Sequence, residues 1–78
     1  MYSSLPRVQA LIAETLQIPP ESITSTLAFG DIAEWDSMGH MQIMMALETQ
    51  FGVDIDADSI LALTTVPAIC AHLEQARV

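Results

Sequence analysis

Basic residues are almost absent from this chain. Its 78 residues include 2 Lys plus Arg against 10 Asp plus Glu, which gives a formal net charge of −8. Because a nucleic-acid backbone or an anionic membrane surface would repel such a chain, we expect it to bind neither. Basic protein surfaces are the partners that this charge favours.

Cysteine and long apolar runs are also scarce. The single cysteine can form neither an internal disulfide nor a zinc cage, which is typical of a reducing compartment. No segment reaches the roughly 20 apolar residues of a membrane span, and the N-terminal segment carries no signal-peptide pattern. We therefore expect a cytoplasmic protein.

The short length of the chain predicts a single domain over residues 1–78. A serine hydrolase or a nucleotide-binding α/β enzyme, with its own cleft and lid, would be crowded at this size. At the same time, 51% of the residues are hydrophobic, which excludes a disordered acidic tail. A small folded domain is the expectation that remains.

Helical periodicity is present in three segments, and no segment has convincing strand alternation. The first helix ends before Pro19, the second runs from about Ser37 to Phe51, and the last covers about residues 65–76. The sequence places Gly52 where a left-handed cap can end the second helix. The apolar faces of the first and last helices are Leu5, Val8, Ile12 and Leu16, and Val66, Ile69, Cys70 and Leu73.

A long loop over residues 18–36 joins the first two helices, and such a loop in a small domain is often functional. Residues 56–61 are expected to form a short helical piece of their own. The predicted fold class is therefore all-α: a small four-helix bundle with a long loop between helices 1 and 2 and a short third helix. The loop's expected anchors to the core are Ile18, Ile23, Leu27, Phe29 and Ile32.

The second helix has two apolar stripes, although a surface helix needs only one. At about 100° per residue, one side carries Ile43, Met44, Leu47 and Phe51, and the nearly opposite side carries Met38, Met41 and Met45. We call the latter three the methionine stripe. It is either core filler in a central helix or an exposed surface whose flexible side chains adapt to partners.

The pair Asp36-Ser37 stands at the junction of the long loop and the second helix. One interpretation is a helix cap that accepts hydrogen bonds from the first unpaired N–H groups. The other follows from the same physics. A helix N-terminus offers free amide donors and the positive end of a dipole, so Ser37 is well placed to carry a phosphate ester.

The sequence EWDSMGHM at 34–41, with MALE at 45–48 and FGV at 51–53, resembles the acyl carrier protein family. The resemblance continues through the first helix, the loop and the last helix. It implies that Ser37 carries a 4′-phosphopantetheine arm, installed from coenzyme A by a phosphopantetheinyl transferase with Mg²⁺, and that Asp36 assists this modification. It also implies that the arm's thiol holds acyl or aminoacyl groups as thioesters and that the carrier itself is non-catalytic.

The second helix departs from the fatty-acid-synthesis carriers, because Glu48 is the only acid inside it and Met38 replaces the common leucine. Docking that is purely electrostatic is therefore less expected, and the methionine stripe becomes the expected recognition surface. The partners that the resemblance implies are the transferase, a loading ligase or acyltransferase, and downstream condensing or modifying enzymes. We expect the carrier itself to be a monomer. The expected partner contacts are Trp35, Met38, His40, Met41, Met45 and Glu48.

Three single side chains have two interpretations each. Trp35 is either an anchor for the loop or a partner contact. His40 is either a polar surface residue or a contact to the prosthetic phosphate. Cys70, which lies on the apolar face of the last helix, is either buried filler or a reactive thiol.

Other chemistry at these residues is weakly supported. The acids Asp54, Asp56 and Asp58 begin like a calcium-binding loop, but Ser59 replaces the glycine and Thr65 the bidentate glutamate, so no metal site is expected. A hydrolase would require Gly-x-Ser-x-Gly around its serine, which this chain lacks. The alternative function is a helical protein–protein interaction module of the same fold without a prosthetic group.

Overall fold

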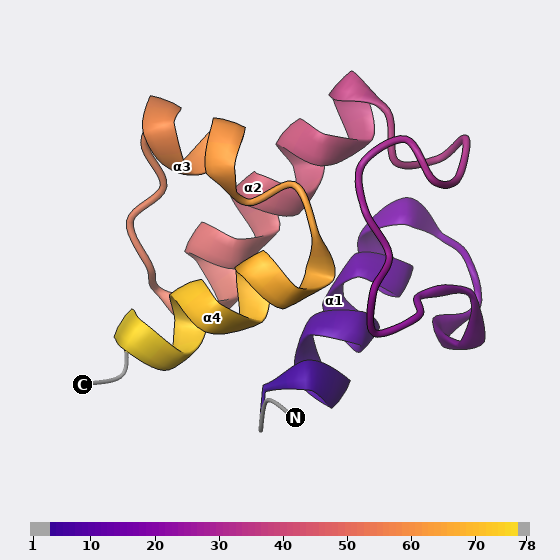
Figure 1. The fold of residues 1–78 in the computed structure, drawn as a ribbon, viewed down its shortest axis with the longest axis horizontal. Helices are drawn as coiled ribbons and strands as arrows, with labels where there is room; N and C mark the ends of the chain where they lie inside the picture. The colour runs from indigo at the N-terminus through magenta and orange to yellow at the C-terminus, as the bar shows by residue number, and fades with distance from the viewer. Residues whose placement is uncertain (1–3, 77–78) are drawn as a thin grey trace.

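The computed structural model describes residues 4–76 and confirms the predicted all-α fold (Figure 1). Four α-helices and one 3₁₀ turn follow one another along the chain: α1 (Leu5–Leu16), η1 (Pro20–Ser22), α2 (Ser37–Phe51), α3 (Ala57–Ala62) and α4 (Val66–Ala76). Within residues 4–76, β-type pairing is limited to one isolated bridge between Ala28 and Thr65. None of the helices in this range is long and apolar enough to cross a membrane.

The bounds of α2 are those predicted from its sequence, because both of its ends carry strong capping signals. At the start, Asp36 Oδ1 accepts a hydrogen bond from the Gly39 N–H at 2.8 Å. At the end, Gly52 adopts the left-handed conformation with φ 68°, and its N–H donates to the Glu48 carbonyl at 3.0 Å. These caps satisfy backbone groups that a helix leaves unpaired at its ends.

Each of the two shorter helices begins at the residue that follows a side-chain cap, which is Asp56 for α3 and Thr65 for α4. Asp56 Oδ1 accepts from the Ser59 N–H at 2.8 Å before α3. Thr65 Oγ1 accepts from the Ala68 N–H at 3.0 Å before α4, and Pro67 lies in the first turn, where its missing N–H costs nothing.

The core is formed where α1 packs against α2 and α4. The expected face of α4 is completely buried, and on α1 the expected face is buried except for Leu16, which is half-buried. Cys70 is buried filler, as one of its two interpretations held, and burial raises the pKa of its thiol. The side chains that are most completely enclosed are Val8, Ile12, Ile23, Trp35, Ile43, Met44, Leu47, Val66, Ile69 and Cys70.

The long loop runs from the end of α1 to the start of α2 and is pinned at several points (Figure 1). Ile23 and Leu27 are buried as predicted. The Phe29 N–H donates to the Thr64 carbonyl and the Val66 N–H to the Leu27 carbonyl, both at 2.8 Å, which ties the loop to the segment between α3 and α4. The expectation that Phe29 is a core anchor was wrong, since 42% of the side chain is exposed.

Candidate functional site

Ser37 is the first residue of α2, and its side chain is exposed. In the first turn, the Gly39 N–H is taken by the Asp36 carboxylate and the His40 N–H donates to the Asp36 carbonyl at 2.8 Å. The amides of Ser37 and Met38 have no hydrogen-bond partner in the described part of the chain. The helix start therefore offers an anion two free donors beside the hydroxyl, rather than the full set of four that an uncapped helix has.

The loop reaches Ser37 by passing very close to the first turn of α2, and Gly39 makes this approach possible. A Cβ on Gly39 would overlap the backbone carbonyl of Glu34 and would lie 3.0 Å from the Leu16 side chain. This role of Gly39 was not among the expectations drawn from the sequence. The available signal was a glycine in the first turn of an otherwise regular helix, which often marks a close backbone approach.

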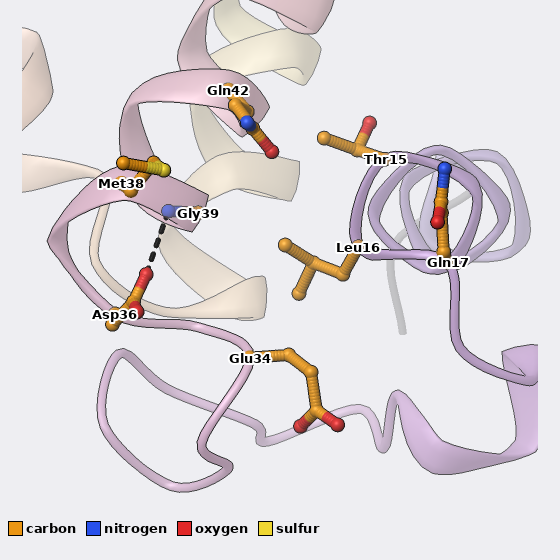
Figure 2. A pocket seen from close by; sticks show the side chains of 8 residues that line it. All are labelled: Thr15, Leu16, Gln17, Glu34, Asp36, Met38, Gly39 and Gln42. Carbon is orange, nitrogen blue, oxygen red and sulfur yellow. Dashed lines mark hydrogen bonds between the residues drawn. The ribbon is translucent and has the colours of Figure 1, made fainter.

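A pocket of about 340 Å³ lies on this side of α2, between its start and the end of α1 (Figure 2). Figure 2 shows the Leu16 side chain pointing from α1 toward the first turn of α2, and the carboxylates of Glu34 and Asp36 along the pocket's loop side. The full lining is Thr15, Leu16, Gln17, Glu34, Asp36, Met38, Gly39 and Gln42. This flank of the site is polar and acidic, which suits a partner with basic side chains.

A second groove, of about 360 Å³, includes Ser37 itself in its wall and is otherwise mostly apolar. We call it the apolar groove. Its outer side chains are open to solvent: Phe29 is 42% exposed, Met41 45% and Leu61 78%. The full lining is Phe29, Ser37, His40, Met41, Ile60, Leu61 and Thr64. Periodicity could not reveal this groove, because it assembles residues from the loop, α2, α3 and the segment after α3.

The methionine stripe lies on the surface, as one of its two interpretations held. Met38 is 72% exposed and Met45 61%, and Met41 lies between them on the same exposed face. On the other face of α2, Ile43, Met44, Leu47 and others meet the core. Glu48 is exposed as well. An exposed row of flexible apolar side chains beside Ser37 is suited to repeated, reversible contact with different proteins.

The structure corrects the expectations for Trp35 and His40. Trp35 is fully buried, so its interpretation as a loop anchor is right and its interpretation as a partner contact is wrong. His40 is also buried. Both of its interpretations, as a polar surface residue and as a contact to the prosthetic phosphate, are therefore wrong. Both ring nitrogens of His40 are already engaged: Nδ1 lies 3.0 Å from the Trp35 Nε1 donor, and Nε2 lies 2.7 Å from the Ile60 carbonyl oxygen.

Among the acidic residues after α2, Asp56 is the one that caps α3. Asp56 accepts hydrogen bonds from both the backbone N–H and the hydroxyl of Ser59, at 2.8 and 2.9 Å, and these bonds lower the pKa of its carboxyl. In the described residues, no group of three or more His, Cys, Asp or Glu side chains is arranged to hold a metal ion. Capping explains why Asp56 stands at this position.

Comparison of the sequence with known proteins identifies the family of this chain. The family profile described as "Phosphopantetheine attachment site" matches residues 6–73. The chain is 32% identical over 74 residues to the acyl carrier protein of Cylindrotheca sp., which covers 95% of this chain and 92% of the relative. The chain belongs to the acyl carrier protein family. It is also 35% identical over 72 residues to acyl carrier protein 3 of Ralstonia nicotianae, covering 92% of this chain and 83% of the relative.

Acyl carrier proteins are in general non-catalytic carriers, and their prosthetic group is covalently attached 4′-phosphopantetheine. The first turn of α2 fits such a group. Ser37 presents an exposed hydroxyl for an ester, and the free amides of Ser37 and Met38 lie where a phosphodiester attached to that hydroxyl can accept hydrogen bonds. Ser37 also belongs to the wall of the apolar groove.

Proposed function

We propose that Ser37 carries the 4′-phosphopantetheine arm and that residues 1–78 are a single carrier domain holding acyl or aminoacyl groups as thioesters. The observation that carries this proposal is the position of one exposed hydroxyl at the start of α2, beside two unpaired amides. When bound, the arm supplies a terminal thiol for thioester formation and a tether that raises the cargo's effective concentration at each enzyme.

The modification proposed at Ser37 is a phosphopantetheinyl transfer from coenzyme A. The Ser37 oxygen loses its proton and forms a bond to the phosphorus that bears pantetheine, while the bond from that phosphorus to the nucleotide phosphate breaks and the adenosine bisphosphate leaves. Asp36 assists the transferase. Its Oδ1 is held by the Gly39 N–H, and its side chain is otherwise exposed, so its carboxylate can meet the Mg²⁺ that the transferase brings.

The partners that we propose are the phosphopantetheinyl transferase, a loading ligase or acyltransferase, and condensing or modifying enzymes of a fatty-acid, polyketide or other specialised pathway. We propose that they meet the protein on the methionine stripe and Glu48, with basic side chains reaching the acidic flank near Glu34. Apolar contacts on α2 would supply most of the binding energy, because charged contacts at an exposed rim contribute little.

The attachment site can be tested by intact-mass measurement after incubation with coenzyme A, Mg²⁺ and a promiscuous transferase. We expect a gain of one phosphopantetheine, which Ser37→Ala abolishes. The matched control is Ser25→Ala, because Ser25 is an exposed serine in the long loop and should not affect the gain. A wild-type protein that is folded but never gains the group would instead support the interaction module without a prosthetic group.

A further inference from the structure

Four of the five methionines of this chain lie within the 15 residues of α2, and the fold places them in two environments. Met44 belongs to the core and is 1% exposed. On the opposite side, the members of the methionine stripe are exposed by 72% at Met38, 45% at Met41 and 61% at Met45. One helix therefore presents three thioether side chains to solvent and shields the fourth.

A solvent-exposed thioether has a specific chemistry, which is oxidation to a sulfoxide. A lone pair of the sulfur attacks one oxygen of hydrogen peroxide, so an S–O bond forms while the O–O bond breaks. The other oxygen leaves with the bonding electron pair and takes the proton of the transferred oxygen, which gives water. Sulfur loses two electrons and the peroxide gains them. Because the peroxide must reach the sulfur, the rate of this reaction follows the exposure of the side chain.

Oxidation of the methionine stripe changes the surface of the protein and leaves its core intact. A sulfoxide is polar and accepts hydrogen bonds, so it is tolerated where water covers it and is costly in a desolvated apolar contact. The buried core includes Met44 and none of the three stripe side chains. We therefore expect the oxidised protein to stay folded, with its apolar stripe made polar.

The stripe is placed so that this change affects access to Ser37. Met38 follows Ser37 directly, and Met41 and Met45 come three and seven residues after Met38 on the same side of α2. The three side chains therefore form one row of about 10 Å along the helix. A protein that covers this row while it acts on Ser37 must desolvate the thioethers. Leucine at the same positions would give a similar apolar row that peroxide does not oxidise.

We propose that the methionine stripe is an oxidation site, at which hydrogen peroxide converts the exposed thioethers to sulfoxides, Met38 and Met45 first, and so weakens docking of the enzymes that act on Ser37. The proposal rests on the docking surface proposed above. The change is reversible by methionine sulfoxide reductases, because two thiols of the reductase become a disulfide while the sulfoxide oxygen leaves as water and the thioether is restored.

The oxidation site can be tested on the unmodified protein. After brief treatment with hydrogen peroxide and quenching with catalase, a Glu-specific protease releases residues 35–48, which contain all four methionines of α2, and fragmentation of this peptide locates each added oxygen. We expect Met38 and Met45 to be oxidised at least about fivefold faster than Met44, with Met41 between them. In urea the four rates should converge. Oxidation of Met44 as fast as that of Met38 and Met45 in the folded protein would overturn the proposed site.

The effect on recognition can be tested by measuring phosphopantetheine transfer to Ser37 after the peroxide has been removed. For protein that is oxidised on the stripe but not at Met44, we expect the KM of the transferase to rise about fivefold with helicity unchanged. Treatment of the same sample with sulfoxide reductases should return the KM to its original value. If the oxidised stripe gives the wild-type KM, oxidation does not control docking and the proposal fails.

Leucine substitutions assign the effect to particular side chains, with each variant compared before and after peroxide treatment. The triple variant Met38→Leu, Met41→Leu, Met45→Leu keeps an apolar row without oxidisable sulfur, so treatment should leave its own KM unchanged. In the matched control Met44→Leu, treatment should still raise the KM about fivefold. A triple variant as sensitive to peroxide as the wild type would contradict the assignment.

Failure of the docking surface gives a different result from failure of the oxidation site. If untreated Met45→Glu is folded and is modified at the wild-type rate, the docking surface proposed on the stripe is refuted. The order of oxidation in the peptide from residues 35–48 is measured without any partner, so it decides the oxidation site in either case.

Discussion

The α-carbon of Gly39 lies so close to the backbone carbonyl of Glu34 that no side chain fits between them. This contact lets the long loop cross the first turn of α2 immediately before Ser37. Two physical effects oppose each other at this position, since glycine weakens a helix while a larger residue would collide with the loop.

The stability of the Gly39→Ala variant tests which of these two effects is larger. Helix propensity alone predicts that Gly39→Ala stabilises the protein by about 1 kcal/mol. The overlap with Glu34 and Leu16 predicts instead a loss of about 1–3 kcal/mol, because backbone cannot move aside as a flexible side chain can. We expect the loss, measured by urea unfolding. Gln42→Ala, at an exposed site one turn along α2, should change stability little, and a more stable Gly39→Ala would contradict the steric account.

The hydrogen bond from Trp35 to His40 can be removed without removing an aromatic ring. Trp35→Phe keeps an apolar ring in the core but leaves His40 Nδ1 without its donor in a buried place. We expect a loss of about 1–3 kcal/mol in the free energy of unfolding, the usual cost of an unpaired buried polar group together with some lost volume. Circular dichroism is the suitable probe, since Trp35 is the only tryptophan. A midpoint equal to wild type would show that the hydrogen bond contributes nothing.

The parts of this protein that sequence could predict are those governed by local rules. The start of α2 follows from a capping acid, its end from Gly52, and its two faces from the spacing of Met38, Met41 and Met45. Each of these depends on neighbours within one or two turns. The position of Ser37 at a helix N-terminus could therefore be predicted from the residues on either side of it.

The parts that sequence could not predict depend on contacts between distant segments. His40 looks like a surface residue because its burial depends on a partner in the loop and a carbonyl in α3, a pairing that no spacing rule encodes. The apolar groove likewise requires Phe29 and Leu61 to meet beside α2. Local patterns predicted that Ser37 lies at the start of α2, while tertiary packing determined its surroundings.

The stability of α3 should depend on pH through Asp56. Hydrogen bonds from the backbone and hydroxyl of Ser59 lower the pKa of the Asp56 carboxyl, so its contribution is present above the ordinary aspartate pKa and is lost as the pH falls through the lowered value. We expect the α3 amides to lose protection from hydrogen exchange over that acidic range. Asp56→Ala should remove this part of the pH dependence, whereas Asp58→Asn, with the cap intact, should retain it. An unchanged acid profile in Asp56→Ala would assign the effect to other acids.

The methionine stripe offers a test that separates recognition from folding. Met45→Glu places a charge on a side chain that is 61% exposed, so helicity and the unfolding midpoint should stay near wild type. The same change should weaken modification by the transferase, because a desolvated apolar contact is lost and a charge must be buried, and a rise in KM of about fivefold or more would match a side chain at the centre of an interface. Met41→Glu should behave similarly.

The matched control is Met44→Glu on the same helix, where the side chain is buried and an unpaired charge should cost about 4 kcal/mol or more and unfold the domain. If Met45→Glu unfolded as Met44→Glu does, the stripe would belong to the core, and if it folded and reacted at the wild-type rate, the transferase would dock elsewhere.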